Sequence, residues 1–195
     1  MNTYPIAPHV IRDSSEGWQL LSIEDEMFNT HRSIEVAGEI TRESVYSLIL
    51  QLRYLQQADP EKEITIYINS PGGSVIDGLA LYDTMALSSN IRTVCVGMAA
   101  SMGALLFAAG NRREMLPHAE IMIHNPAVKC LSGSALQIEE ESRRLMQMRK
   151  TTAEILAKHT GHTIEEVYEK TKQDTYFSAE EAVKWGLADR IIREI

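Results

Sequence analysis

The sequence predicts an α/β protein made of repeated strand–helix units. Short apolar, β-branched runs at residues 64–68 and 91–96 predict buried strands, and each is followed by small residues and then by an apolar helix. A strand, a turn of small residues and a helix, in that order, are typical of a parallel sheet. The 195 residues suit one such domain, because a chain of this length buries most of its surface in a single core.

The N-terminal segment, residues 1–28, shows no lasting period of two or 3.6 residues. We therefore predict a flexible or partner-dependent segment, followed by a single domain at residues 29–195. Residues 33–40 predict a strand, and Thr41 is expected to cap a helix that Asp59-Pro60 ends.

The strand at residues 64–68 is expected to lead through a glycine turn into a helix at 75–87. Further short strands are predicted at residues 114–116, 120–124 and 190–192. Apolar periodicity predicts a long helix at about residues 134–160, which Gly161 ends. This helix is too polar to be buried within one domain, so we expect it to project or to pack against another subunit. Two capping boxes, Thr163 with Glu166 and Ser178 with Glu181, predict short helices after it.

Composition and charge exclude several classes of function. The net charge of −8 opposes binding to nucleic acid or to an anionic membrane, which requires clustered Lys and Arg. No apolar run approaches the roughly 20 residues that cross a bilayer, and the N-terminus lacks the features of a secretory signal. Cys95 and Cys130 form neither a disulfide framework nor a zinc spacing. We expect a cytoplasmic protein.

Residues 94–110 are the most informative stretch. A buried strand breaks at a glycine, passes small residues and Ser101, and becomes an apolar helix that we expect to end on Gly110 as a left-handed cap. The first N–H groups of a helix lack intrahelical partners, so a hydroxyl at Ser101 is placed for attack on a carbonyl, and the N–H of Met102 for binding the oxyanion. The alternative is a small residue packed at a tight helix start.

A nucleophilic serine needs a base and an acid that orients the base. Of the six histidines, His124 is the best candidate because it ends an apolar strand, where strand ends line the active edge of an open sheet. A structural histidine is the alternative. Asp174 is an attractive acid because Tyr176 and Phe177 are expected to shelter its carboxylate. Rival acids remain: Asp77, Asp83 and Asp189. The glycine turn at residues 70–73 offers a second oxyanion donor, although such turns also bind phosphate.

Four motifs follow one another along the chain: INSPGGS at residues 68–74, GMAASMGALLFAAG at 97–110, MIHNP at 122–126 and DTYFSAEEAVKWGLAD at 174–189. Together they closely resemble the ClpP family, the proteolytic subunits of ATP-dependent Clp proteases. The resemblance runs from about residue 34 to the C-terminus. It implies a crotonase-like fold with a handle helix.

Residue by residue, the resemblance implies Ser101 as nucleophile, His124 as general base, Asp174 as orienting acid, and the N–H groups of Gly73 and Met102 as the oxyanion hole. It also matches two docking-pocket positions for a partner unfoldase, Tyr67 and Leu187. The implied activity is a serine endopeptidase that works through an acyl-enzyme and needs no metal and no cofactor, since ATP is used by the partner.

The resemblance further implies a homo-oligomer of two stacked heptameric rings, a tetradecamer, whose handle helices interleave. A Clp-family AAA+ unfoldase would dock on it and thread unfolded polypeptide through a pore lined by the N-terminal segment. The chain departs from the family in three places, of which the first is the N-terminal segment to Phe28. Residues 125–130 replace a glycine-rich strand that pairs with substrate, and Lys172-Gln173 replaces an Asp-Arg pair that joins the rings.

Two alternative functions stay open at this point. The departures are compatible with a catalytically silent subunit that works in a mixed ring with a paralogue. A crotonase-type acyl-CoA enzyme would share the fold and would use the same backbone N–H groups to polarise a thioester, although that chemistry usually relies on carboxylates.

Overall fold

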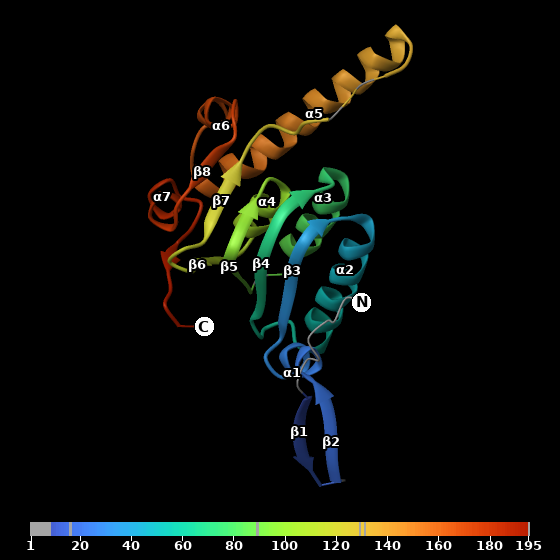
Figure 1. Ribbon diagram of the computed structural model, residues 1–195, viewed down its shortest axis with the longest axis vertical. Coiled ribbons are helices and arrows are strands. Elements are labelled where there is room, and N and C mark those ends of the chain that lie inside the picture. The colour runs from blue at the N-terminus through green and yellow to red at the C-terminus, as the bar shows by residue number, and fades with distance from the viewer. Residues whose placement is uncertain (1–8, 16, 89, 129, 131, 195) are drawn as a thin grey trace, which may run out of the picture.

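The computed structural model describes residues 9–15, 17–88, 90–128, 130 and 132–194. Within these ranges the chain forms one seven-stranded, mostly parallel sheet and a separate two-stranded hairpin. Figure 1 shows the sheet and its helices at the centre, the hairpin projecting at one end and the long helix α5 (Ala135–Thr160) projecting at the other. The predicted α/β architecture is confirmed.

Five parallel strands form the main path of the sheet, in the order β3-β4-β5-β6-β9. Their bounds are β3 Ser33–Ile40, β4 Ile64–Gly73, β5 Ile91–Ala100, β6 Arg112–Met115 and β9 Arg190–Ile191. The interior strand β4 begins with an almost continuous run of buried residues, as is usual for parallel strands in a core.

Strand β5 pairs with two strands in succession. Its residues 92–95 pair with β6, whereas its residues 98–100 pair with β7 (Glu120–Ile123). Strand β7 in turn pairs antiparallel with β8 (Thr175–Phe177). This arrangement brings the ends of β5 and β7 and the start of β8 to one place on the sheet.

Helix α4 (Met102–Ala108) lies at the centre of the core. All of its residues are buried, and it packs against β4, β5, α3 (Val75–Ala86) and α5. Helix α2 (Arg42–Ala58) packs against α3 and β3 and is capped by Thr41, as predicted. Its buried side chains have helical spacing: Val45, Leu48, Leu52 and Leu55.

Helix α5 begins after its cap Ser134 and ends at Gly161, whose φ of 77° is the left-handed conformation that suits glycine. Its buried residues lie only in the C-terminal half: Thr152, Ala153, Ile155 and Leu156. The N-terminal half extends away from the rest of the chain (Figure 1). The prediction that this helix is not buried within one domain is confirmed. The two predicted capping boxes begin α6 (Ile164–Lys170) and α7 (Ala179–Lys184).

The N-terminal segment contains regular structure that the sequence did not predict. Strands β1 (His9–Ser14) and β2 (Gly17–Ser22) form an antiparallel hairpin, and α1 (Ile23–Asn29) follows. Residues 1–8 and 16 of this segment lie outside the described residues. The domain boundary predicted between residues 28 and 29 falls inside α1. Most of β2 is exposed, so the hairpin lacks the alternation of buried and exposed side chains that identifies a strand.

Two local predictions were wrong near the glycines. Strands β4 and β5 continue to Gly73 and Ala100, beyond the predicted ends at residues 68 and 96, because pairing with neighbouring strands persists through the small residues. Gly110 is not a left-handed cap, since its φ is not positive. It is required for space instead: a Cβ there would lie 2.3 Å from the hydroxyl oxygen of Thr93.

A buried carboxylate joins the end of the chain to the sheet. Glu114 of β6 is fully buried and forms ion pairs with Arg92 of β5 (2.6 Å) and Arg190 of β9 (2.5 Å). Burial opposes ionisation, but the hydrogen bonds from Arg190 and Arg92 outweigh it and lower the pKa of Glu114.

Among the described residues, no helix is both long and apolar enough to cross a membrane.

Candidate active site

Ser101 and His124 follow two neighbouring parallel strands. Ala100, the last residue of β5, pairs with Met122 of β7, and the N–H of Ser101 donates to the carbonyl oxygen of Met122 (2.8 Å). The carboxyl ends of parallel strands meet at one edge of a sheet, so the residues that follow them lie together.

Asp174 reaches the same edge by way of β8. This strand runs antiparallel to β7, with Ile123 opposite Thr175. The residue after β7 and the residue before β8 are therefore neighbours, and these are His124 and Asp174. The sequence did not predict β8, because three residues are too few to show a period.

The three side chains form one chain of hydrogen bonds. His124 Nε2 lies 2.9 Å from Ser101 Oγ, and His124 Nδ1 lies 3.2 Å from Asp174 Oδ1. Both distances are those of hydrogen bonds. If the proton of the neutral imidazole is on Nδ1 and is donated to Asp174, Nε2 carries no proton and can accept the proton of the Ser101 hydroxyl. The structure thus brings together the three residues that the sequence singled out.

Two of the rival acids have other partners. The Asp77 carboxylate accepts a hydrogen bond from the hydroxyl of Ser74, the residue that caps α3, and Asp189 forms an ion pair with Arg113. The expected shelter for Asp174 was wrong, however, because its side chain is 60% exposed in the single chain. Of the two aromatic neighbours, Phe177 is buried in the core and Tyr176 is 54% exposed.

The backbone of Ser101 has a conformation that is rare outside glycine, with φ 54° and ψ −119°. Such a conformation is strained for a residue with a Cβ and persists only where its surroundings impose it. Here the chain turns sharply from β5 into α4. A sharp turn from strand to helix exposes the hydroxyl of its central serine, as in α/β-hydrolases.

Gly72 lies directly against this turn. A Cβ at Gly72 would lie 2.7 Å from the carbonyl oxygen of Ala100 and 2.7 Å from the Cβ of Ser101. Its φ of 94° also favours glycine. The glycine-rich end of β4 therefore contacts the Ser101 turn, and sequence spacing alone does not reveal this contact.

The two backbone N–H groups expected from the sequence to bind an oxyanion belong to Met102 and Gly73. Met102 is the first residue of α4, so its N–H lacks an intrahelical partner. Gly73, the last residue of β4, follows Gly72, whose backbone lies against the Ser101 turn.

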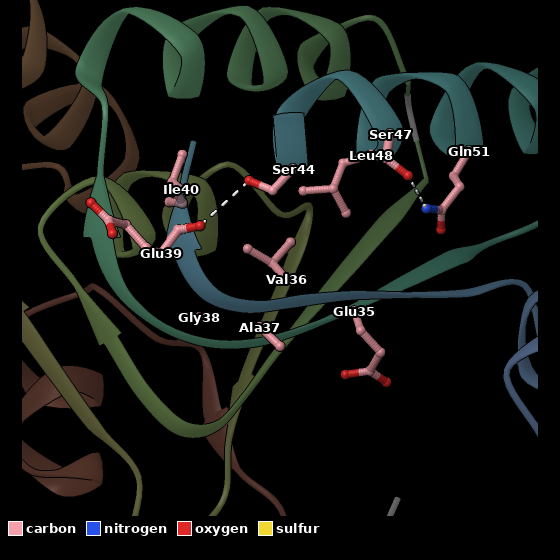
Figure 2. A pocket seen from close by; sticks show the side chains of 10 residues that line it. All are labelled: Glu35, Val36, Ala37, Gly38, Glu39, Ile40, Ser44, Ser47, Leu48 and Gln51. Carbon is pink, nitrogen blue, oxygen red and sulfur yellow. Dashed lines mark hydrogen bonds between the residues drawn. The ribbon is translucent and has the colours of Figure 1, made fainter. Parts of the chain in front are cut away.

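A small pocket opens beside Ser101 and His124, and its walls include the apolar side chains of Val75, Leu105 and Pro126. A second hollow lies between β3 and α2 (Figure 2). Burial raises the pKa of Glu35, which lines this second hollow. No residue of the hydrogen-bonded chain lines it, so it is separate from the candidate site.

A polar contact that the sequence did not predict ties the His124 loop to the helices. Arg149 Nε of α5 donates to Asn125 Oδ1 (3.2 Å), and the Arg149 guanidinium lies 4.0 Å over the Tyr168 ring. The N–H of Asn125 donates to the carbonyl of Thr171 (3.0 Å). Asn125 follows His124 and Thr171 precedes Asp174 by three residues, so this contact holds the two loops together.

Two of the three departures from the ClpP pattern lie close to the candidate site in the sequence. The described residues between His124 and Ser134 form no helix or strand, and positions 129 and 131 lie outside the described residues. Lys172 forms an exposed ion pair with Glu169 of its own chain (2.7 Å).

The two expected docking residues differ in their environment. Leu187 is fully buried in the core of the single chain, and its role in docking stays a prediction. Tyr67 on β4 is partly exposed. No group of three or more His, Cys, Asp or Glu side chains among the described residues is arranged to hold a metal ion.

One comparison with known proteins bears on this site. A family model described as Clp protease matches residues 16–195, which is almost the whole chain and includes all three side chains of the hydrogen-bonded chain. The mostly parallel sheet with its helices is the ClpP-type, crotonase-like fold. The chain belongs to the Clp protease family.

Proposed function

We propose that this chain is a serine endopeptidase, the proteolytic subunit of a Clp-type chambered protease. The observation that carries the proposal is the continuous chain of hydrogen bonds from Ser101 Oγ through the His124 imidazole to the Asp174 carboxylate. Membership of the Clp protease family supports a Clp-type peptidase. The roles of the individual residues rest on the geometry.

In the first step, His124 Nε2 takes the proton of Ser101 as Oγ attacks the carbonyl carbon of a peptide bond. Asp174 holds the imidazole in the required tautomer and stabilises the imidazolium that forms. The negative charge on the carbonyl oxygen is bound by the N–H groups of Met102 and Gly73. The tetrahedral intermediate collapses as His124 gives its proton to the leaving amine, which breaks the C–N bond and leaves an acyl group on Ser101.

In the second step, water replaces the amine. His124 takes a proton from the water as its oxygen attacks the acyl carbon, and the proton then returns to Ser101 Oγ as the carboxylic acid leaves. The enzyme is regenerated without a change of oxidation state. No metal or cofactor takes part in this scheme.

We also propose the setting in which this chemistry takes place. The projecting half of α5 supports an assembly of two stacked heptameric rings, because a helix that leaves its own domain offers its side chains to another subunit. Unfolded polypeptide would be delivered by an AAA+ unfoldase that uses ATP, with Tyr67 as a docking residue. The apolar walls of the pocket beside Ser101 favour an apolar substrate side chain next to the scissile bond.

The test is the Ser101→Ala variant. We expect peptide cleavage to fall by about 10⁶-fold, because the nucleophile is lost, while ring assembly in sedimentation velocity stays unchanged. A fluorophosphonate probe should label the wild type and not the variant. The matched control is Ser47→Ala, an exposed serine on α2, which should keep both cleavage and labelling.

Undiminished cleavage by Ser101→Ala would overturn the proposal. Stable stacked rings of the pure wild-type protein that cleave no peptide would favour the silent subunit of a mixed ring instead.

A further inference from the structure

Strand β4 contains a bulge just before the glycines that face Ser101. Ala37 of β3 pairs with Asn69 of β4, but the next pair is Glu39 with Gly72. Over this interval strand β4 therefore contains one residue more than β3. The extra residue lies at Ser70 and Pro71. A bulge leaves backbone groups without their usual partners, and Pro71 has no N–H to offer.

The Ser70 hydroxyl makes the hydrogen bonds that the backbone cannot. Its Oγ donates to the carbonyl oxygen of Gly38 on β3 (2.6 Å) and accepts from the N–H of Gly72 (3.1 Å). One hydroxyl thus uses its donor and an acceptor lone pair at the same time, and Ser70 is fully buried. Figure 2 shows Gly38 at the bend of β3, where the strand turns toward Ile40.

Ser70 contacts the two chain segments that contain the proposed oxyanion donors. On one side it holds Gly72, which touches the Ser101 turn and is followed by Gly73. On the other side the Ser70 backbone faces the start of α4, since a Cβ at Gly103 would lie 3.1 Å from the Ser70 carbonyl oxygen. Gly103 is the residue after Met102. Ser70 therefore packs between the segments that carry the two N–H groups.

We propose that Ser70 is a positioning residue for the oxyanion hole. By locking the bulge of β4 to Gly38, its hydroxyl sets the orientation of the Gly72–Gly73 peptide and so aims the Gly73 N–H at the oxygen that becomes negative during attack by Ser101. This inference rests on the proposed peptidase function. It assigns to Ser70 no contact with substrate.

A purely structural role for Ser70 makes a different prediction. If the hydroxyl only stabilises the fold, its loss lowers stability without changing the turnover of the molecules that remain folded. If it aims an oxyanion donor, its loss weakens binding of the transition state more than binding of the substrate. The ratio of the effects on kcat and KM separates the two roles.

The experiment compares Ser70→Ala with Ser33→Ala in the full chain. Ser33 is a matched control because it is also a buried serine on this sheet whose hydroxyl donates to a backbone carbonyl, that of Met27 (2.9 Å), far from the candidate site. With a fluorogenic peptide, we expect Ser70→Ala to lower kcat by about 10-fold or more with KM within about twofold, whereas Ser33→Ala leaves both unchanged. Losing a donor entirely costs about 10²–10³-fold, so a misaimed one costs less.

A transition-state analogue gives a second readout. A peptide boronate forms a tetrahedral adduct in which Ser101 Oγ bonds to boron and the proton passes to His124, and one boron-bound oxygen then occupies the oxyanion position. The inhibition constant of Ser70→Ala should rise by the same factor by which kcat/KM falls. The pH profile of kcat/KM should keep its shape, because the hydroxyl contacts neither His124 nor Asp174.

The inference is overturned if assembled Ser70→Ala has the kcat and the boronate affinity of the Ser33→Ala control. Should Ser70→Ala fail to assemble, Ser70→Cys carries the test, since a thiol of similar size is a weak donor: unchanged kcat and boronate affinity would again overturn the inference. Failure of the proposed function gives a different result. The wild type itself would then cleave no peptide, or Ser101→Ala would cleave peptide as fast as the wild type. Either result would also overturn the inference on Ser70.

Discussion

At the scale of single residues, the candidate site depends on a backbone that only small side chains permit. Ser101 is held at a positive φ, and Gly72 fills the space next to it so closely that no Cβ fits. The strain at Ser101 costs of order 1–3 kcal/mol, which the fully buried helix α4 offsets through its packing. The backbone conformation of Ser101 is therefore imposed by its neighbours rather than by its own conformational preference.

This dependence predicts the effect of Gly72→Ala. The new Cβ would collide with Ala100 and Ser101, so the Ser101 turn must shift, and a displacement of about 1 Å at a reacting group costs about 10²-fold in rate. We expect kcat/KM for a fluorogenic peptide to fall by at least that factor, with a parallel loss of fluorophosphonate labelling.

The control for this variant is Gly161→Ala at the end of α5. Gly161 also has a positive φ, but a Cβ there meets nothing within 4 Å. It should destabilise the protein by about 1 kcal/mol through backbone strain alone and leave kcat unchanged. Equal kinetics for the two variants would show that crowding at Gly72 is unimportant.

At the scale of elements, the sequence predicted helix ends better than strand ends. Caps are local, so Thr41, Ser134 and Gly161 marked helix boundaries that the structure reproduces. Strand β8 and the pairings that extend β4 and β5 depend on neighbours far along the chain, and no local pattern records them. The residues of the candidate site could thus be named in advance, whereas the β7–β8 pairing that brings Asp174 to His124 could not.

The attachment of α5 to α3 should depend on pH. Tyr82 OH and His159 Nε2 share a hydrogen bond of 2.9 Å, and burial, with the nearby charges of Lys158 and Arg113, lowers the pKa of His159 from 6.5 to about 4. The unfolded chain then binds more protons than the folded chain between these values. The free energy of unfolding must therefore fall as the pH falls from about 7 toward 4.

The variant His159→Gln should remove part of this pH dependence. Because His159 is only half-buried, we expect its share between pH 7 and pH 5 to be about 1 kcal/mol. Urea unfolding followed by circular dichroism at both pH values, at one protein concentration, measures it. His118→Gln, at an exposed histidine, is the control and should behave as the wild type. A wild-type pH dependence in His159→Gln would contradict the prediction.

At the scale of the whole molecule, the chain has two parts that leave its core, the β1–β2 hairpin and the N-terminal half of α5 (Figure 1). Both carry exposed apolar side chains, which monomeric proteins rarely gather on projecting elements. On the hairpin these are Ile11, Trp18 and Leu20, and on α5 they are Leu136, Ile138 and Met146. Such surfaces are consistent with the proposed assembly.

These exposed side chains predict that negative charges introduced on α5 would dissociate the proposed rings. Leu136 and Met146 are 77% and 57% exposed in the single chain, so replacing both with Glu should leave the fold intact while placing charges in the proposed contact between rings. Sedimentation velocity should report smaller assemblies, with an unchanged circular dichroism spectrum. Glu139→Gln, at an exposed residue of the same helix, should assemble normally. Assembly of the double variant at wild-type size would refute this prediction.

The divided pairing of β5 has a consequence for how the site would switch off. His124 and Asp174 flank the paired strands β7 and β8, whereas Ser101 follows β5, and β5 pairs with β7 along residues 98–100, next to the hydrogen bond from the Ser101 N–H to Met122. A small shift of β7 and β8 relative to β5 would move the His124 imidazole away from the Ser101 hydroxyl. The hydrogen bond between His124 and Asp174 would be kept. In an inactive form of this protein, His124 should therefore remain hydrogen-bonded to Asp174 but not to Ser101.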